Sequence, residues 1–203
     1  GGMDEIHGGS GNDTIYGDDI ESDIAGPNDA FYGDEGNDLI YGFAGRDELY
    51  GGDGDDTLYG GANADNLVGG PGQDRLDGGE DGDSLDAGPG DDDVDGGGGE
   101  DWIWGWDGDD CLIGGAGADV IFGLNGNDFI RGDAGDDGLQ GGDYQTGADI
   151  ICGGSGTSVI WGGWDGDLCL ATEDSEVNGC EVQLATEEQC EMTCDEWRTT
   201  LLR

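Results

Sequence analysis

The sequence predicts an all-β fold in which short parallel strands stack into a solenoid. A nine-residue pattern, G-G-x-G-x-D-x-U-x with U an apolar residue, recurs from Gly2 to about Leu170. Its sixth position is almost always Asp and its eighth is apolar, so the segment after each Asp alternates as a strand does. The 203 residues carry 50 acidic and 5 basic side chains, a formal charge of −45. Such a chain should not fold in water without bound cations.

The repeats keep one register through about 18 copies. Two insertions, near 19–25 and 144–146, fall in glycine-rich parts of a repeat, and we expect surface loops there that leave the stack intact. The sixth position is occupied by Asp4, Asp13, Asp29, Asp38, Asp47, Asp56, Asp65, Asp74, Asp83, Asp92, Asp101, Asp110, Asp119, Asp128, Asp137, Asp149, Ser158 and Asp167. The eighth position is occupied by Ile6, Ile15, Phe31, Ile40, Leu49, Leu58, Leu67, Leu76, Leu85, Val94, Ile103, Leu112, Ile121, Ile130, Leu139, Ile151, Ile160 and Cys169.

This spacing suits a hard divalent cation. Ca²⁺ takes about six to eight oxygen ligands, and glycine-rich turns supply backbone carbonyls because glycine reaches positive φ. The Asp at position six adds a carboxylate. One turn offers too few ligands, so two stacked turns must share each ion, with position eight pointing inward and positions seven and nine pointing outward.

These residues resemble the RTX, or haemolysin-type, calcium-binding nonapeptide repeats of secreted bacterial proteins. The resemblance implies a right-handed parallel β-roll, a β-solenoid in which two repeats form one coil and calcium lies between the turns of repeats n and n+2. It further implies a rod about 40 Å long at ~4.8 Å per coil, holding about 14 to 16 Ca²⁺ ions that cancel some 30 of the 45 negative charges. The expected metal ligands are Asp13, Asp29, Asp38, Asp47, Asp56, Asp65, Asp74, Asp83, Asp92, Asp101, Asp110, Asp119, Asp128, Asp137, Asp149 and Asp167.

Several residues depart from the pattern and should weaken particular sites. Ser158 replaces the Asp of position six, and Cys169 replaces the last aliphatic residue. We therefore expect the C-terminal end of the roll to be the weakest part of the calcium ladder. Other departures are Ala87 at position one and Pro27, Asn63 and Asp165 at position four.

Composition and motifs exclude several function classes. The negative charge repels nucleic acid and anionic membranes, and no apolar run approaches the ~18 residues of a membrane span. We expect no catalysis, because G-x-S-x-G and a P-loop lysine are missing and the single histidine, His7, lies at an outward position. An EF-hand starting at Asp91 is excluded because its twelfth loop position falls on Trp102. Gly1–Glu5 has neither a basic nor an apolar segment, so we expect no signal peptide in this sequence.

The outward positions differ along the chain. Tyr occupies position nine in the first third, which strand propensity alone explains. Asp follows in the middle, and then come apolar residues that something should cover. These apolar residues are Trp102, Trp104, Ile113, Val120, Phe122, Phe129, Ile150, Val159, Trp161, Leu168 and Leu170.

The tail, 171–203, is one candidate cover, and another subunit is the alternative. Thr186 with Glu187–Gln189 resembles a capping box that opens a helix near 187–199. Its apolar stripe would dock on the outer face or plug the end of the roll. The six cysteines favour disulfides and an oxidising compartment over thiolate metal ligands at Cys190 and Cys194, and they allow 15 pairings among which the sequence does not choose.

The sequence thus predicts a calcium-binding β-roll over 1–170 and a Cys-rich capping tail over 171–203. The predicted function is that of a non-catalytic structural or interaction protein outside the cell or at its surface. It would be a rod that forms a surface filament, adhesin or surface layer, with self-association through the solenoid ends or the apolar outer face. The alternative is a calcium-triggered secretion and folding module of a larger toxin, protease or lipase.

Overall fold

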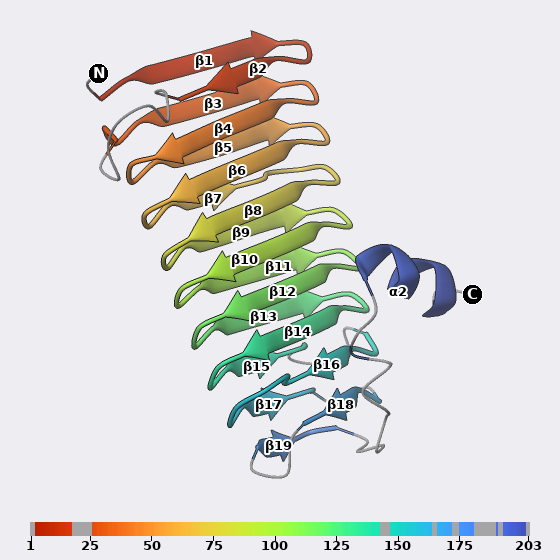
Figure 1. Ribbon diagram of the computed structural model, residues 1–203. Helices are drawn as coiled ribbons and strands as arrows, with labels where there is room; N and C mark the ends of the chain where they lie inside the picture. Colours follow the sequence, from red (N-terminus) through yellow and green to blue (C-terminus); the bar gives the residue numbers. More distant parts are fainter. Residues whose placement is uncertain are drawn as a thin grey trace.

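The computed structural model describes residues 3–17, 26–142, 147–163, 166–171, 175–180, 190 and 193–201. The described chain is a parallel β-solenoid of two facing sheets with one C-terminal helix beside it (Figure 1). Successive strands alternate between a ten-stranded and a nine-stranded sheet, so strand n pairs with strand n+2. The predicted all-β solenoid with two repeats per coil is confirmed.

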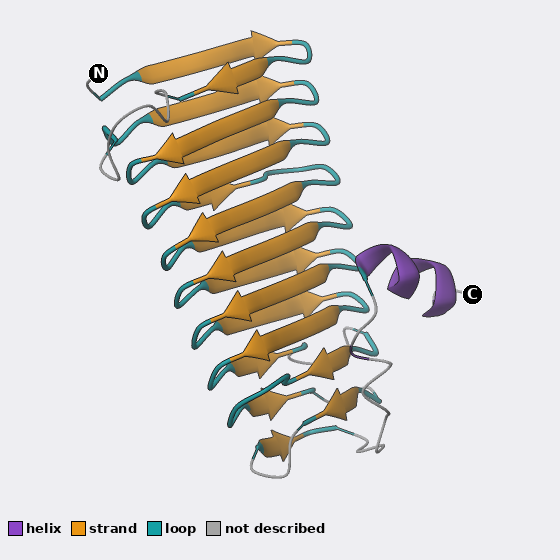
Figure 2. Cartoon of the chain, in the orientation of Figure 1, coloured by secondary structure: helices purple, strands orange, loops and turns teal. Residues whose placement is uncertain are grey.

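Most strands are three or six residues long and run between tight turns (Figure 2). The ten-stranded sheet, called the odd sheet, contains β1 (Glu5–Ser10), β3 (Ala30–Glu35), β5 (Glu48–Asp53), β7 (Asn66–Val68), β9 (Ser84–Pro89), β11 (Trp102–Asp107), β13 (Val120–Asn125), β15 (Gly138–Gln140), β17 (Val159–Trp161) and β19 (Glu176–Asn178). The nine-stranded sheet, called the even sheet, contains β2 (Thr14–Tyr16), β4 (Leu39–Ala44), β6 (Thr57–Ala62), β8 (Arg75–Glu80), β10 (Asp93–Gly98), β12 (Cys111–Ala116), β14 (Phe129–Ala134), β16 (Ile150–Cys152) and β18 (Leu168–Leu170).

The core is a double column of position-eight side chains, one from each strand. From Ile15 to Cys169 these residues are buried and form one continuous apolar cluster between the sheets. The two insertions lie outside the described residues, yet the register continues across them. Ile15 pairs with Ile40, and Ile130 pairs with Ile151. Both insertions therefore leave the stack intact, as the sequence predicts.

The turns require unusual backbone conformations. Position two of the repeat lies at positive φ, and Gly occupies it in most coils, for example Gly52 at 115°. Phe43, Trp106 and Leu124 adopt the same conformation at 73°, 79° and 81°. A bulky L-residue there costs about 1–2 kcal/mol relative to its preferred conformations. These three side chains are thus held against local backbone preference.

The outward tyrosines of the first coils form stacked columns. On the odd sheet the rings of Tyr32 and Tyr50 lie 4.9 Å apart at their centroids. On the even sheet Tyr41 and Tyr59 are also 4.9 Å apart. Strand propensity accounts for tyrosine at these positions, and the parallel register then brings equivalent rings face to face.

The tail packs on the outer face of the even sheet through helix α2 (Cys194–Leu201) (Figure 1). Trp197 is 2% exposed and its ring centroid lies 5.9 Å from that of Phe129 on β14. Cys111, Cys152 and Leu170 complete this second apolar cluster. Of the two placements considered for a tail helix near 187–199, the helix Cys194–Leu201 takes the docked one, and it packs on the outer face of the even sheet.

The start of α2 is fixed by a capping box at Thr193. Its N–H donates to Glu196 Oε2 over 3.0 Å, and the Glu196 N–H donates to Thr193 Oγ1 over 3.3 Å. The capping box proposed at Thr186–Gln189 lies outside the described residues. Beyond Leu170, β19 adds a further strand to the odd sheet by pairing with β17. Among the described residues, no helix is long and apolar enough to cross a bilayer.

Candidate calcium ladder

The position-six aspartates form two columns, one along each row of turns. Each lies at the turn immediately before a strand, because the glycine-rich segment ends there and the apolar alternation begins. Asp13 is half-buried, and all the other proposed ligands are buried, none more than 4% exposed. The fold therefore brings the predicted ligands into line, while Asp4, which is outside the predicted set, is exposed.

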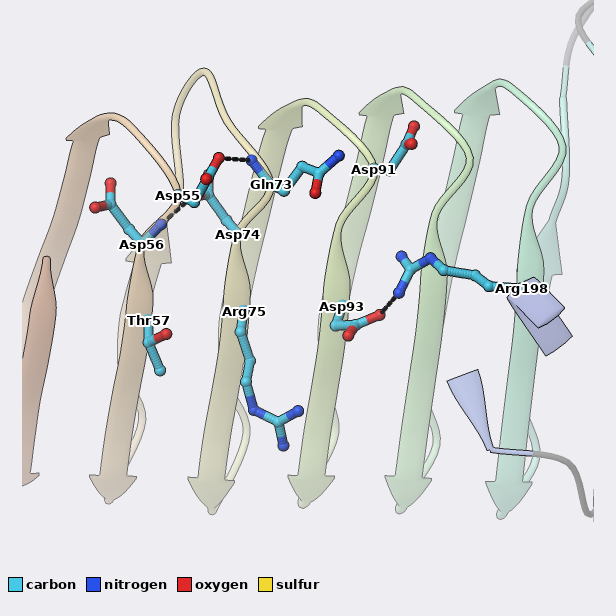
Figure 3. Close-up of a pocket in the computed structure, with 9 residues that line it drawn as sticks. All are labelled: Asp55, Asp56, Thr57, Gln73, Asp74, Arg75, Asp91, Asp93 and Arg198. Atoms are coloured by element: carbon cyan, nitrogen blue, oxygen red, sulfur yellow. Dashed lines mark hydrogen bonds and ion pairs between the residues drawn. The ribbon is translucent and has the colours of Figure 1, made fainter. Parts of the chain in front are cut away.

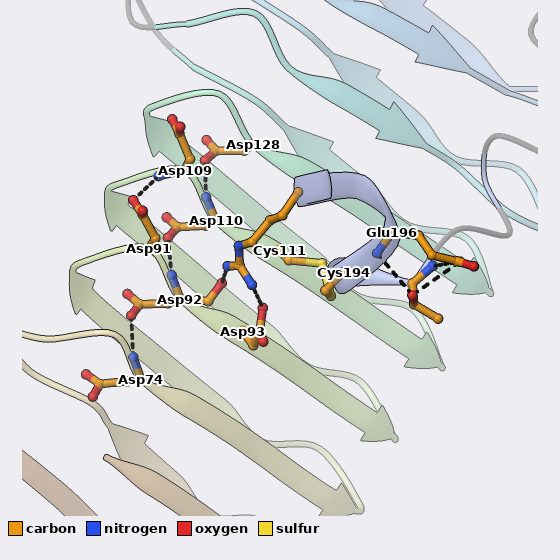
Figure 4. Close-up of polar contacts among 12 residues, drawn as sticks. Asp74, Asp91, Asp92, Asp93, Asp109, Asp110, Cys111, Asp128, Cys194 and Glu196 are labelled. Carbon is orange, nitrogen blue, oxygen red and sulfur yellow. Dashed lines mark hydrogen bonds and ion pairs between the residues drawn. A yellow bond between two sulfur atoms is a disulfide. The ribbon is translucent and has the colours of Figure 1, made fainter. Parts of the chain in front are cut away.

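From Asp29 to Asp167, one carboxylate oxygen of each proposed ligand accepts a backbone N–H within the column. The backbone N–H of Asp74 donates to Asp92 Oδ1 over 2.7 Å, and that of Asp92 donates to Asp110 Oδ1 over 2.9 Å (Figure 4). The same bond crosses the first insertion, from Asp13 N–H to Asp38 Oδ1 over 2.7 Å. These bonds align the carboxylates along the solenoid axis and fix their rotamers.

The second carboxylate oxygen, Oδ2, is buried without a hydrogen-bond partner through most of both columns. A buried unpaired carboxylate oxygen is costly, which makes a repeated set of them a strong indication of a bound cation. The aspartates with this buried Oδ2 are Asp13, Asp38, Asp47, Asp56, Asp65, Asp74, Asp83, Asp92, Asp101, Asp110, Asp119, Asp128 and Asp137.

Backbone carbonyls lie close to these oxygens. A Cβ built on Gly33, at position one, would lie 2.3 Å from Asp38 Oδ2 and 2.4 Å from the carbonyl oxygen of Gly51 in the next coil. Glycine is required here because the carboxylate and a carbonyl from the stacked turn converge on the space of a side chain. The donor set, carboxylate plus carbonyl oxygens, fits Ca²⁺.

The electrostatics of the columns also call for positive charge. Burial raises the pKa of Asp74, Asp83 and Asp128 to about 8, against the lowering effect of the backbone N–H that each accepts. Neighbouring position-six carboxylates raise these pKa values further. Without a cation, the columns would therefore favour protonated carboxyls near neutral pH.

The column along the odd sheet is interrupted at Ser158. Its hydroxyl donates to the carbonyl of Gly153 over 3.1 Å, and its N–H donates to Ser175 Oγ over 3.1 Å. The buried position is thus filled by neutral groups. Asp167 continues the even column, where its Oδ1 accepts the N–H of Asp149 over 3.0 Å.

A second, exposed ladder at position five was missed by the sequence reasoning. The Asp109 N–H donates to Asp91 Oδ1 over 2.9 Å, and the Asn127 N–H donates to Asp109 Oδ1 over 2.8 Å. The bond direction is opposite to that of position six. The signal that would have found it is the recurrence of Asn, Asp or Gln in the turns before the even strands, at Asn12, Asn37, Asp55, Gln73, Asp91, Asp109 and Asn127.

All six cysteines form disulfides, which confirms that prediction and excludes thiolate ligands at Cys190 and Cys194. Asp93, Cys111 and Cys194 lie close enough to resemble a metal site, but the two sulfurs are bonded to each other. The bridges tie the even sheet and the roll end to the tail. They are Cys111–Cys194, Cys152–Cys190 and Cys169–Cys180.

Arg198 places a fixed positive charge beside the even column. It pairs with Asp93 (Figure 3), and its Nη2 donates to the carbonyl of Asp92 over 2.9 Å. It lowers the pKa of Asp92, although burial has the larger effect and the pKa is raised to about 7. The guanidinium also lines a pocket over β6, β8 and β10 (Figure 3). The pocket residues are Asp55, Asp56, Thr57, Gln73, Asp74, Arg75, Asp91, Asp93 and Arg198.

A sequence comparison supports the resemblance inferred from the repeats. The profile of the RTX calcium-binding nonapeptide repeat matches residues 1–19, 28–58, 50–85, 59–94, 86–121, 113–143 and 145–173. These matches cover the part of the chain that forms the two aspartate columns. No curated protein matched the sequence.

Proposed function

The chain belongs to the RTX calcium-binding nonapeptide repeat family, and we propose on this premise that it is an extracellular structural protein that becomes a rigid rod when it binds Ca²⁺. The protein is a calcium-binding repeat protein with a β-solenoid fold. Beyond this, we propose the protein's location, the number of ions that it binds and the role of the rod. No catalytic role is assigned to it.

The single observation that carries the proposal is the repeated buried Oδ2 of position six. We propose that each ion is held between stacked turns by these carboxylates and by glycine carbonyls of the same turns. The ligand set is the one expected from the sequence, from Asp13 to Asp167. About 14 to 16 ions would neutralise some 30 charges of a chain whose formal charge is −45. Bound calcium would then stabilise the rod against its own repulsion.

The disulfides support a location outside the cell. Three bridges in so small a chain persist only in an oxidising compartment. Millimolar calcium outside cells would fill sites that the low calcium of a cytoplasm leaves empty. The proposed location is therefore the extracellular medium or the cell surface.

A role as a filament, adhesin or surface-layer subunit follows from the shape. Within the described chain, β1 and β19 are the terminal strands of the odd sheet. Pairing of β19 with β1 of another copy would continue the parallel register. We propose head-to-tail association through these ends as the route to a polymer.

A calcium titration of the metal-free oxidised chain tests the proposal. Circular dichroism should report gain of β structure, native mass spectrometry should count about 14 to 16 ions, and negative-stain electron microscopy should show rods or polymers. Mg²⁺ is the control cation, because its smaller octahedral shell fits these turns poorly. A metal-free chain that is already a rod, with few ions bound on titration, would contradict the proposal. Separate rods without polymers would favour a folding module instead of a filament subunit.

A further inference from the structure

The outer surface of β11 and β13 carries an aromatic patch on the side of the roll opposite to α2. We define the Trp face as the outward residues of these two strands. Each residue of one strand lies beside its partner in the other, as the register pairs Trp102 with Val120, Trp104 with Phe122 and Trp106 with Leu124. The even sheet of the same coils is covered by the tail, whereas Trp102 and Trp106 are 50% and 47% exposed.

The aromatic rings of the Trp face support one another. The Trp104 ring stacks on that of Trp102 with centroids 5.9 Å apart, and on that of Phe122 with centroids 6.2 Å apart. Stacking fixes the orientation of the rings before any ligand arrives. An ordered aromatic surface loses less conformational entropy on binding than flexible side chains would.

The conformation of Trp106 indicates that its side chain serves something other than the fold. Trp106 lies at φ 79°, in the position where Gly88 and Gly97 stand in the two preceding repeats. A glycine would satisfy the turn without strain, so the backbone of the turn does not require an indole there. Leu124, in the next coil of the same sheet, repeats the feature at φ 81°. Strained bulky residues at an exposed patch are typical of binding sites.

The charges around the Trp face are all negative. Asp86 on β9 lies beside Trp104 in the register and accepts a hydrogen bond from the Trp106 indole. Asp107, at the end of β11, accepts a hydrogen bond from the Asn125 amide over 2.6 Å. The strands β9, β11, β13, β15 and β17 contain no Lys, Arg or His. By contrast, Arg131 and Arg198 lie on the side of the even sheet.

We propose that the Trp face binds a cationic partner, namely a Lys- or Arg-rich segment of another protein. Basic side chains would lie over the indole rings, and Asp86 and Asp107 would supply the ion pairs. Cations bind favourably to the faces of Trp rings, more so when they are desolvated. A second copy that docks through the same face is disfavoured, because that face carries no basic residue to pair with Asp86 and Asp107. Anionic partners are disfavoured for the same reason.

Binding of a synthetic alternating Lys–Leu peptide to the calcium-loaded full chain tests this proposal. A Glu–Leu peptide of equal length and a soluble cello-oligosaccharide serve as comparison ligands, at physiological salt. We expect the Lys–Leu peptide alone to bind, measured by calorimetry and Trp fluorescence, with affinity that falls as salt rises. Stronger binding of the Glu–Leu peptide or of the glycan would overturn the proposed partner chemistry.

The variant Trp106→Gly separates binding from folding. It removes an indole and relieves the positive-φ strain, so the thermal midpoint should not fall while the affinity for the Lys–Leu peptide drops at least about five-fold. Phe43→Gly is the matched control, since it relieves the same strain at φ 73° on the even sheet and should leave affinity unchanged.

Two further variants keep the test decisive. Trp102→Thr removes an exposed indole with a residue suited to a strand and should weaken binding in the same direction. Asp86→Asn should lower the affinity for the Lys–Leu peptide and reduce the dependence of that affinity on salt. Unchanged affinity in Trp106→Gly, Trp102→Thr and Asp86→Asn would refute a cation site on the Trp face. Sedimentation showing dimers that Trp106→Gly dissociates would reassign the face to self-association.

Discussion

The first coils and the last coils of the solenoid are held together in different ways. From β1 to β9 the coils are joined by backbone pairing between strands, by one buried apolar side chain per repeat, by the aspartate columns and by the stacked tyrosines. From β10 to β18 the roll also carries α2, three disulfides and the Arg198–Asp93 ion pair. The first coils are thus held together by contacts within the repeats, whereas the last coils are also cross-linked to the tail.

The contrast follows from the sequence of the last coils. Ser158 removes a carboxylate from one column, and Cys169 replaces the inward aliphatic residue of the last repeat. Cys169 bonds to Cys180 and so adds a covalent link in the last repeat. The disulfides therefore supply cohesion at the end of the roll, where the repeat loses its consensus residues.

The largest expected effect is that of calcium removal from the oxidised chain. Chelation should unfold the coils from β1 to β9. Without cations the buried carboxylates repel one another, and the contacts with Ca²⁺ that would offset the cost of removing them from water are lost. The coils from β10 to β18, which the disulfides link to the tail, should retain part of their structure. Circular dichroism in excess chelator should show a partial spectrum, which reduction then abolishes. A spectrum unchanged by chelator would contradict the difference between the two regions.

The next largest effect is expected from loss of the Cys111–Cys194 disulfide in the presence of calcium. Replacing both Cys111 and Cys194 with Ser removes a bridge that spans 83 residues, and chain entropy predicts a loss of about 4 kcal/mol. Denaturant unfolding followed by Trp fluorescence measures it. The double variant Tyr32→Thr with Tyr50→Thr, which disrupts the tyrosine stack of the first coils, is the control and should cost far less. Equal losses would mean that the disulfides are not the dominant element of the last coils.

The pH dependence of the metal-free roll has a predictable sign. The pKa values of Asp74 and Asp83 are raised by burial to about 8 in the folded state, from an ordinary value near 4. Stability from these groups is complete below pH ~4 and is lost as pH rises toward ~8. Circular dichroism of the chelated chain should therefore show more β structure at pH 5 than at pH 8. With calcium bound, the order should reverse, since protons compete with the ion.

The smallest expected effect is that of a single ligand. Asp83→Ala should remove at most about two ions and leave the other coils folded, because solenoid contacts are made between neighbours. Asp81→Gly is the matched control, as it removes one exposed carboxylate from the same turn at φ 73°, where glycine fits. Native mass spectrometry gives both counts. Loss of all calcium from Asp83→Ala would mean that the sites are coupled along the whole rod.

The nine-residue repeat of the sequence made most of the fold predictable. Position eight specifies the core and position six specifies the aspartate columns, because every repeat imposes the same alternation on the same register. The register also continues across both insertions, because each falls in a glycine-rich part of a repeat and leaves the flanking strand segments unchanged. The exposed ladder at position five was missed because Arg46, Glu100 and Thr157, together with Gly and Ala, interrupt the series of Asn and Asp residues at that position.

The tail was predictable only in part. Its helix and its docking face follow from an apolar stripe and an uncovered sheet, but the capping box at Thr193 resembles the one proposed at Thr186, and only packing distinguishes such motifs. The disulfide pairing depends on which cysteines share a face. Cys111 and Cys152 point outward on the even sheet toward the tail, whereas Cys169 lies in the inward column.

Hydrogen exchange measured by mass spectrometry, on the oxidised chain in millimolar calcium and in excess chelator, is the most direct test of the ion-held solenoid. We predict slow exchange along the whole roll in calcium. In chelator, protection should be lost from β1 to β9 and retained in part from β12 to β18, where the bridges to the tail lie. Equal protection of the first coils with and without calcium would contradict the role assigned to the aspartate columns.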